Sequence, residues 1–206
     1  MLGEPVEKAD TSTFDIDYIG IKASQFSFAR LHKADPVLGV DMSSTGEVGC
    51  IGADFDEALL NAMISVGHRV PDKSKAVLVS SGDARGKVDL LDSCKVLADN
   101  GYKIYATEGT SVFLNSNGVK AYPVCWPDDE GENILDLLAN HAIDLVVNIP
   151  KNNTKSELTN GYRIRRSAID HNIPLLTNAR LATAYINAFI NKPIDEVGIL
   201  SWDEYK

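Results

Sequence analysis

The chain has 206 residues, of which 44% are hydrophobic and 24% are charged, as is ordinary for soluble globular proteins. Its formal net charge of −9 argues against a nucleic-acid surface, although it leaves room for a local basic pocket. The three cysteines are odd in number and far apart, and the four histidines lack metal-ligand spacing. We therefore expect a reducing, cytoplasmic location without disulfides or a metal site. No apolar run is long enough for a membrane span.

The first 75 residues carry mixed patterns that predict a small α+β segment. Residues 1–13 are polar and are expected to form a mobile lead-in. Residues 14–23 alternate apolar and polar side chains, which predicts a strand with one buried face. Residues 24–35 fit a short helix or irregular structure. The remaining segments are assigned as strands at 39–43 and 48–51 around a turn at 44–47, a helix at 56–66 and a linker at 68–74.

From residue 76 onward, short buried strands alternate with amphipathic helices. Such repeated units require a parallel sheet with helices on both faces and right-handed crossovers. The predicted strands are 76–80, 104–106, 119–124, 144–148 and 173–176. The predicted helices are 83–100, 111–117, 134–140, 160–170 and 178–190, with a long polar loop at 149–159. The fold class is therefore α/β, with a five-stranded parallel sheet in a three-layer domain after the α+β segment.

The stretch Lys103–Thr110 predicts an anion site. It begins as a short strand, continues as a hydroxyl-rich turn at Thr107–Thr110 and is followed by a helix. Such a turn lies at the carboxyl edge of a parallel sheet, where backbone N–H groups and the helix dipole face a ligand. The hydroxyls of Thr107 and Thr110 can donate to that ligand. In the plainer interpretation Thr110 is only an N-cap and Thr107 only a strand residue.

Three further side chains are predicted at the same edge. Lys87 follows the start of the first helix, where a lysine opposes the helix dipole unless an anion is bound; a solvated surface lysine is the alternative. Trp126 fits either the core or a flat wall for a ligand. Asn148 ends a buried strand, where its amide can read a carboxylate, an amide or a ribose, or can simply form a turn.

The edge offers hydroxyls, amides and lysines, which can hold a small polar ligand. The loop 151–155 is long and polar, as functional or disordered loops are. The arginines after it, Arg163, Arg165 and Arg166, face an anion, a partner domain or solvent, and solvent is the commonest case. The chain has no Walker loop, no G-x-S-x-G, no dinucleotide fingerprint and no carboxylate cluster with a histidine. These absences favour binding over catalysis.

Two groups of motifs identify a family. The first group is Phe26–Phe28, Asp35–Gly39 and Met42–Val48, and the second is Ala106–Thr110, Val147–Pro150, Asn152–Thr154, Tyr162–Arg166 and Ile173–Asn178. With them the chain resembles the C-terminal part of the large (synthetase) subunit of carbamoyl-phosphate synthetase. The resemblance implies an ATP-grasp remnant with a linker at residues 1–70 and a methylglyoxal-synthase-like regulatory domain at residues 71–206.

The resemblance also implies a function. In that family this domain binds allosteric effectors, while the ATP-grasp halves perform the ATP-dependent ligase chemistry for pyrimidine or arginine biosynthesis. We therefore expect no catalytic site and no cofactor in this chain, with ATP and Mg or Mn belonging to the full-length enzyme. The expected partners are the remainder of the synthetase subunit and a glutaminase subunit. Because Met1 falls in mid-domain by family standards, the chain resembles a piece of a longer protein.

The family pattern implies a set of effector-binding residues. Thr107 and Thr110 would hold a phosphate or carboxylate, and Lys87 matches a lysine of the branch that responds to nucleotides such as UMP and IMP. The branch that requires N-acetylglutamate is matched by Trp126, Asn148 and Asn160, whereas Lys151 stands where that branch has asparagine. The chain mixes the two signatures, so both effector types stay open.

Two other functions remain as alternatives. This region helps subunits associate in the family, and residues 14–66, without their ATP-grasp body, would expose apolar surface; this predicts a structural fragment that self-associates. Fold similarity alone suggests phosphate elimination of the methylglyoxal-synthase type. The catalytic aspartates of that enzyme are not matched, and Glu108 stands where its turn has a smaller residue.

Overall fold

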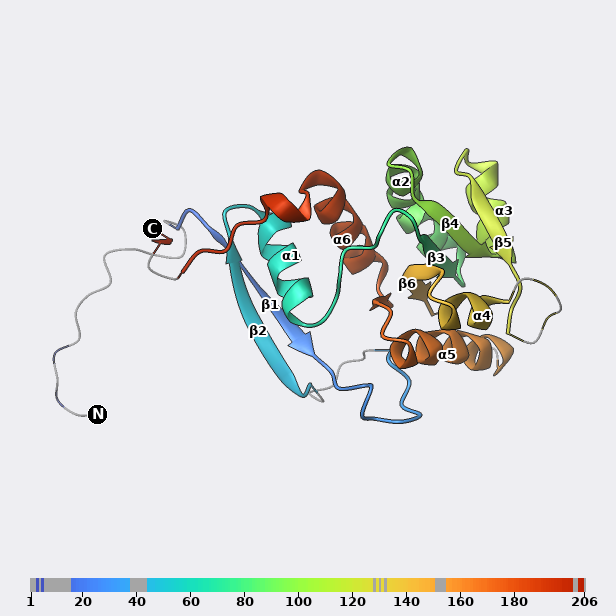
Figure 1. Cartoon of the computed structure of the whole chain (residues 1–206), viewed down its shortest axis with the longest axis horizontal. Coiled ribbons are helices and arrows are strands. Elements are labelled where there is room, and N and C mark those ends of the chain that lie inside the picture. The colour runs from blue at the N-terminus through green and yellow to red at the C-terminus, as the bar shows by residue number, and fades with distance from the viewer. Residues whose placement is uncertain are drawn as a thin grey trace.

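The computed structural model describes residues 3, 5, 16–37, 44–127, 129, 131, 133–150, 155–201, 204 and 205, the side chains of 155–158 excepted. Its elements alternate between strands and helices after an initial pair of strands (Figure 1). In chain order they are β1 (Ile19–Gln25), β2 (Gly46–Gly52), α1 (Phe55–Ser65), β3 (Ala76–Ser81), α2 (Ala84–Asp99), β4 (Lys103–Thr107), α3 (Glu108–Ser116), β5 (Ala121–Val124), α4 (Ile134–Ala139), β6 (Ile143–Ile149), α5 (Lys155–Asp170), β7 (Leu175–Leu176), α6 (Ala179–Asn191) and a 3-10 turn at Ile194–Glu196.

The predicted five-stranded parallel sheet is confirmed. Its strand order is β5-β4-β3-β6-β7, and every neighbouring pair is parallel. One face packs against α2, α3 and α6, and the other packs against α4 and α5. The domain therefore has three layers. The central strand, β3, is buried along its whole length because helices cover both of its faces.

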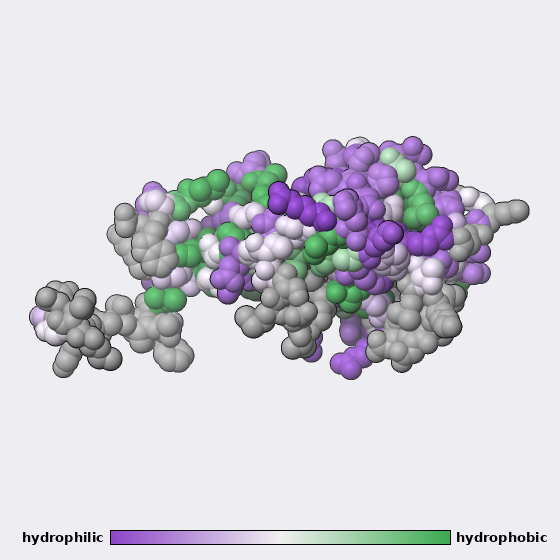
Figure 2. Space-filling model, turned by 90° about the horizontal axis from the view of Figure 1, so that it is seen from below, coloured by the Kyte–Doolittle hydropathy of each residue, from purple (hydrophilic) through white to green (hydrophobic). Residues whose placement is uncertain are grey.

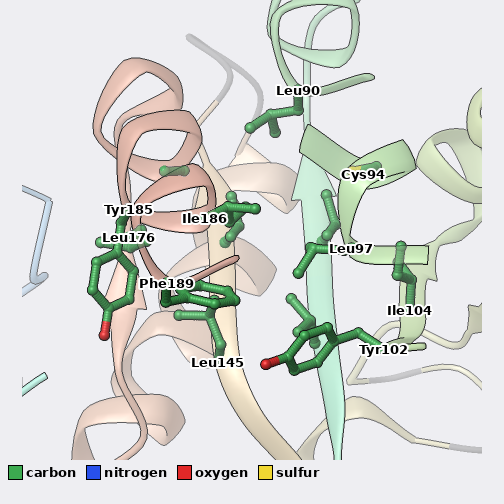
Figure 3. Packing of buried hydrophobic residues seen from close by; sticks show 14 of the residues in the cluster. Leu90, Cys94, Leu97, Tyr102, Ile104, Leu145, Leu176, Tyr185, Ile186 and Phe189 are labelled. Carbon is green, nitrogen blue, oxygen red and sulfur yellow. The ribbon is translucent and has the colours of Figure 1, made fainter. Parts of the chain in front are cut away.

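The larger of two hydrophobic clusters fills the layer between the sheet and helices α2, α3 and α6. Figure 3 shows that Leu90, Cys94 and Leu97 of α2 lie on the same face of the sheet as Ile186 and Phe189 of α6. The smaller cluster, on the opposite face, includes Leu78, Leu138, Val146 and Ile164. Successive residues of β3 thus alternate between the two clusters, as the period of two in a strand requires.

The N-terminal part is a two-stranded antiparallel sheet that packs on α1. β1 pairs with β2 along its full length, from Ile19 opposite Gly52 to Gln25 opposite Gly46. The apolar side chains of α1 belong to the same cluster as those of the parallel sheet. Seen from below, the parallel-sheet end of the molecule is mostly hydrophilic, and green patches gather toward the β1–β2 end (Figure 2). The division at residue 70 remains a prediction.

Some predicted boundaries were wrong. The strand predicted at 14–23 begins only at Ile19, and Ile16 is 39% exposed. The turn predicted at 44–47 is partly strand, since β2 begins at Gly46, and the predicted strand at 39–43 lies outside the described residues. Helices α3 and α5 begin at Glu108 and Lys155, so each extends further toward the N-terminus than predicted.

The linker between the two parts is docked rather than detached. Arg69 donates to Oδ1 of Asp144 at 2.7 Å, and the backbone N–H of Asp72 donates to Oδ2 at 2.9 Å. Burial would raise the pKa of Asp144, but these two contacts lower it below its usual value. His68 lies edge-on to the ring of Tyr185, with 6.0 Å between centroids, which ties the linker to α6. No helix in the described ranges is long and apolar enough to cross a membrane.

The buried imidazole of His68 predicts a loss of stability in mild acid. Burial lowers the pKa of His68 to about 4, from 6.5. The unfolded chain therefore binds the proton more tightly, and stability present above pH 6.5 falls as the pH drops toward 4. At pH 5 the loss is about 2 kcal/mol. Thermal unfolding at pH 7 and pH 5 should show a smaller difference for His68→Leu than for the unchanged chain, and equal differences would contradict this account.

Candidate functional site

A pocket lies at the carboxyl edge of the parallel sheet, where β3, β4 and β6 end. Its volume is about 200 Å³, and its walls come from these strand ends, from the starts of α2 and α3, and from α5. Because the strands are parallel and adjacent, their ends bring together segments that are far apart in the chain. This is the edge at which the sequence predicts an anion site.

Three hydroxyl groups lie together at the edge of the sheet that lines the pocket. Thr107 Oγ1 lies 3.3 Å from Ser80 Oγ and 3.3 Å from Thr110 Oγ1. Thr110 Oγ1 accepts from the backbone N–H of Ser81 at 3.2 Å and donates to the Ser81 carbonyl oxygen at 3.3 Å. Thr107 and Thr110 therefore tie the end of β4 and the first turn of α3 to the end of β3.

The start of α3 leaves polar groups for a ligand. Thr107 is the N-cap of α3, but its side chain makes no capping hydrogen bond. The first N–H groups of a helix otherwise need such a partner, so they are open to an anion in the pocket. The hydroxyl of Ser81 also lacks a hydrogen-bond partner among the described residues, but it is buried against Gly86, behind the pocket.

Thr110 is not the N-cap of α3, contrary to the plainer interpretation of the sequence. The helix begins at Glu108, which places Thr110 inside its first turn. Glu108 suits this position because an acidic side chain is favourable near the positive end of the helix dipole. The hydroxyl of Thr110 is thereby turned toward β3 and the pocket.

Lys87 supplies a positive charge at the pocket wall. It is half-buried on the first turns of α2, and its Nζ lies near Gly109 of α3. No ion pair to Lys87 is present among the residues that the structure describes. A bound anion would give this lysine the partner that it lacks there and would offset its unfavourable position near a helix start.

Trp126 combines the two roles that the sequence left open. Its ring packs against the smaller hydrophobic cluster and also lines the pocket. It follows β5 and the bridge between Cys125 and Asn133, which fixes the start of the next loop. Trp126 therefore provides a flat apolar wall opposite the hydroxyl groups.

Asn148 is held in place by a buried arginine. Arg165, on α5, donates from Nη1 to Asn148 Oδ1 at 2.9 Å. The same guanidinium donates to both carboxylate oxygens of Asp35, at 2.8 and 2.5 Å. Arg165 was expected to face solvent most commonly, but its side chain is only 3% exposed and it lines the pocket. Its charge is already matched by Asp35.

Five of the seven predicted effector residues line this one pocket: Lys87, Thr107, Thr110, Trp126 and Asn148. Asn160 does not line it, although the next residue, Gly161, does. Lys151 lies outside the described residues. Ser80, Ser81 and Arg165 also line the pocket but were not among the predicted effector residues, although the sequence placed both serines at this edge and named Arg165 among three arginines that could face an anion. The role of all these residues in binding remains a prediction.

The arrangement can hold a small anion. Helix N–H groups and Lys87 donate hydrogen bonds, and hydroxyls can do so too, which suits a phosphate or a carboxylate. No group of three or more possible metal ligands occurs among the described residues.

Close packing behind the pocket predicts opposite responses to two glycine substitutions. A Cβ on Gly86 would lie 2.5 Å from Ser81 Oγ and 2.8 Å from Asp83 Oδ1, so Gly86→Ala should lower stability despite the better helix propensity of alanine. A Cβ on Gly109 would meet only the flexible end of Lys87, at 3.3 Å. Gly109→Ala is the matched control and should be neutral or stabilising by up to about 1 kcal/mol. Thermal unfolding that ranks the variants in reverse would contradict this packing.

Comparisons with known proteins give a family. Residues 89–177 match the MGS-like domain. The chain is 42% identical over 196 residues to the multifunctional protein ura1 of Schizosaccharomyces pombe, covering 91% of this chain and 9% of that protein. It is 39% identical over 216 residues to the mitochondrial carbamoyl-phosphate synthase (ammonia) of Homo sapiens, covering 100% of this chain and 14% of that protein.

The chain spans only 9% of the length of the first of these relatives and 14% of the length of the second. Among solved structures, a methylglyoxal synthase from Elizabethkingia anophelis NUHP1 aligns with a TM-score of 0.42 at 16% identity, covering 63% of this chain and 89% of that one, which is too remote to argue from. The sequence matches are sufficient. The chain belongs to the carbamoyl-phosphate synthase family, as a segment of its C-terminal region that contains the MGS-like domain.

Proposed function

We propose that this chain is an effector-binding regulatory region of a carbamoyl-phosphate synthase, and that it holds a small anion in the pocket at the carboxyl edge of its sheet. The observation that carries the proposal is the uncapped start of α3 beside the half-buried Lys87, whose Nζ lies near Gly109. Both groups lack an anionic partner among the described residues. The family supplies the setting, since the relatives are much larger polypeptides.

The chemistry of the walls suggests where each part of the ligand lies. The phosphate or carboxylate would accept hydrogen bonds from the start of α3 and would pair with Lys87. The Thr107 and Thr110 hydroxyls would donate to it after turning from their present acceptors, the Ser80 hydroxyl and the Ser81 carbonyl oxygen. A flat or aliphatic part would pack on Trp126, and an oxygen atom would accept from the amide of Asn148. UMP and IMP present a phosphate and a flat base, and N-acetylglutamate presents carboxylates and an amide.

The reaction itself belongs elsewhere in the protein under this proposal. The remainder of the synthetase, with ATP and Mg or Mn, would carry out the ligase steps for pyrimidine or arginine synthesis, with a glutaminase as a further partner. The described pocket has hydrogen-bond donors without a general base poised beside a nucleophile. This supports binding rather than phosphate elimination.

A thermal-shift panel tests the proposal. The chain is heated alone and with UMP, IMP, UTP, inorganic phosphate or N-acetyl-L-glutamate. A ligand at one hundred times its dissociation constant adds about 2.7 kcal/mol of stability. For a chain of this size the unfolding midpoint should rise by roughly 5–10 °C. The absence of a shift with every compound would count against effector binding by this chain.

Two variants assign the binding to the pocket. Lys87→Gln and Thr110→Val each remove one contact to the anion, worth about 1.5–3 kcal/mol, so the dissociation constant should rise about ten- to a hundredfold. Lys95→Gln lies on the same helix as Lys87 and pairs with Asp92, so it is the matched control for charge.

Thr183→Val is the corresponding control for the threonine. The hydroxyl of Thr183 contacts Ser93 at 3.0 Å, between α6 and α2 and away from the pocket. Titration calorimetry should show full affinity for both controls. If the controls weaken binding as much as Lys87→Gln and Thr110→Val do, the anion binds somewhere else.

A further inference from the structure

One wall of the pocket is held by a segment that comes from the other end of the chain. Residues 26–37, which we call the docking segment, follow β1 and lie against α5 (Figure 1). The phenol of Tyr162 donates to the carbonyl oxygen of Lys33 at 3.0 Å. Arg166 is mostly buried, and its Nη1 points into the segment. This nitrogen lies 3.1, 3.2 and 3.4 Å from the carbonyl oxygens of Phe28, Leu31 and Ala34.

These contacts place Asp35 where it reaches the pocket-lining Arg165. The two residues are 130 positions apart in sequence and form a bidentate ion pair through Nε and Nη2 of the arginine. The remaining guanidinium nitrogen, Nη1, donates to Asn148 at the end of β6. Gly161 makes room for this guanidinium, because a Cβ there would lie 2.9 Å from Arg165 Nη1. Asp35, Arg165 and Asn148 thus form a continuous chain from the docking segment into the pocket.

The chemistry of this chain fixes which atom of Asn148 faces a ligand. A guanidinium can only donate hydrogen bonds, so Asn148 must turn its Oδ1 toward Arg165. The Nδ2 group is then the amide atom left to donate to a ligand in the pocket, which Asn148 lines. If Arg165 moved away, Asn148 would lose the contact that selects this orientation. The orientation of the Asn148 amide, which would donate to a carboxylate or phosphate, therefore depends on contacts of Arg165 with a segment outside the pocket.

Asp35 is the residue that keeps Arg165 in contact with Asn148. The side chain of Arg165 is 3% exposed, whereas that of Asp35 is 40% exposed. Removing the carboxylate would leave a buried charge without its partner, which is strongly unfavourable. The guanidinium would then rearrange toward water or toward the pocket, and in either case Asn148 would lose the partner that orients its amide. Neither outcome preserves the present position of Asn148.

We propose that Asp35 is a positioning residue for the anion pocket, acting through Arg165 and Asn148, so that docking of residues 26–37 and ligand binding strengthen each other. This inference rests on the proposed function and adds a route by which occupancy is felt outside the MGS-like domain. Coupling between two sites is reciprocal: if docking of the segment raises ligand affinity, the ligand stabilises docking by the same factor.

Calorimetric titrations of Asp35→Asn test the first half of this coupling. The probes are inorganic phosphate, UMP, IMP and N-acetyl-L-glutamate, each added to the intact 206-residue chain. The variant keeps the size of the side chain but loses its charge. For any probe that binds the unchanged chain, its dissociation constant should rise about tenfold, in the usual range for coupling between sites. Asp35→Glu should recover part of the loss.

Asp92→Asn is the matched control. Asp92 lies on α2 and pairs with Lys95 at 3.1 Å, and neither residue lines the pocket. This variant changes the charge equally, but it should alter the dissociation constant by less than about twofold. Equal effects of Asp35→Asn and Asp92→Asn would overturn the inference, because they would reduce the effect of Asp35 to a change of overall charge.

Hydrogen exchange tests the reciprocal half without any substitution. Adding a binding probe to the unchanged chain should slow amide exchange in residues 26–37, although the segment does not line the pocket. A purely structural ion pair predicts no such change. Protection confined to the pocket, with an unchanged exchange rate in the docking segment, would overturn the inference while leaving the proposed function intact.

A double-variant cycle tests the physical link without a ligand. Asp35→Asn, Asn148→Ala and the double variant are compared by their thermal unfolding midpoints. Because both side chains act on Arg165, the double variant should lose less than the sum of the single losses. Additive losses would show that the chain of contacts carries no coupling. If the cycle is non-additive but none of the probes binds, the proposed function and its regulation by Asp35 are both wrong, and only the structural link remains.

Discussion

The parallel pairing of β4, β3 and β6 puts Thr107, Ser80, Ser81 and Asn148 at one edge of the sheet. These residues come from three separate stretches of sequence, and only the common direction of the strands brings them together. The same direction aims the start of α3 at the space between them. Replacing the parallel order by a meander would scatter these groups over both edges. The strongly buried β3, which neighbours both other strands, is therefore the foundation of the pocket.

The charges around the pocket are arranged in two different ways. Arg165 is neutralised by Asp35 and acts mainly as a fixed donor to Asn148. Lys87 stands half-buried without an ion-pair partner in the described part of the chain, and Glu108 lies at the exposed rim. Lys87 and the neutral donors favour a small anion held by hydrogen bonds, whereas the carboxylate of Glu108 opposes it. The overall charge of −9 also repels an approaching anion, so these local contacts must outweigh it.

Local pattern was sufficient for most of the sheet and for part of the site. Runs such as Ala76–Ser80 consist almost entirely of apolar residues, which predicts strands buried on both faces. The residues that follow such runs are then predicted to lie at the carboxyl edge of the sheet. The helices that begin at Glu108 and Lys155 were predicted to begin later in the chain, because their polar first turns carry no apolar periodicity. Gly109 also suggested a turn, although glycine is tolerated in a first helical turn.

Arg165 could not be assigned from its neighbours in sequence. Three arginines lie close together on α5, and nothing local says which of them are buried. The choice is made by Asp35, 130 positions away, and by the carbonyl oxygens of the docking segment. Long-range partners of this kind are a tertiary property. The order of the strands in the sheet is a second tertiary property. The sequence predicted that the strands are parallel, but it did not predict which strands are neighbours.

If an anion binds at the carboxyl edge of this sheet, the amide chemical shifts of that edge will change on titration. The isotope-labelled chain would be titrated with N-acetyl-L-glutamate and, separately, with UMP, and its backbone N–H signals followed by NMR. We expect the largest changes at Ser81, Gly109, Thr110 and Asn148, with smaller changes in residues 26–37. Saturable changes that cluster elsewhere, or no change with either compound, would show that this edge is not the binding site.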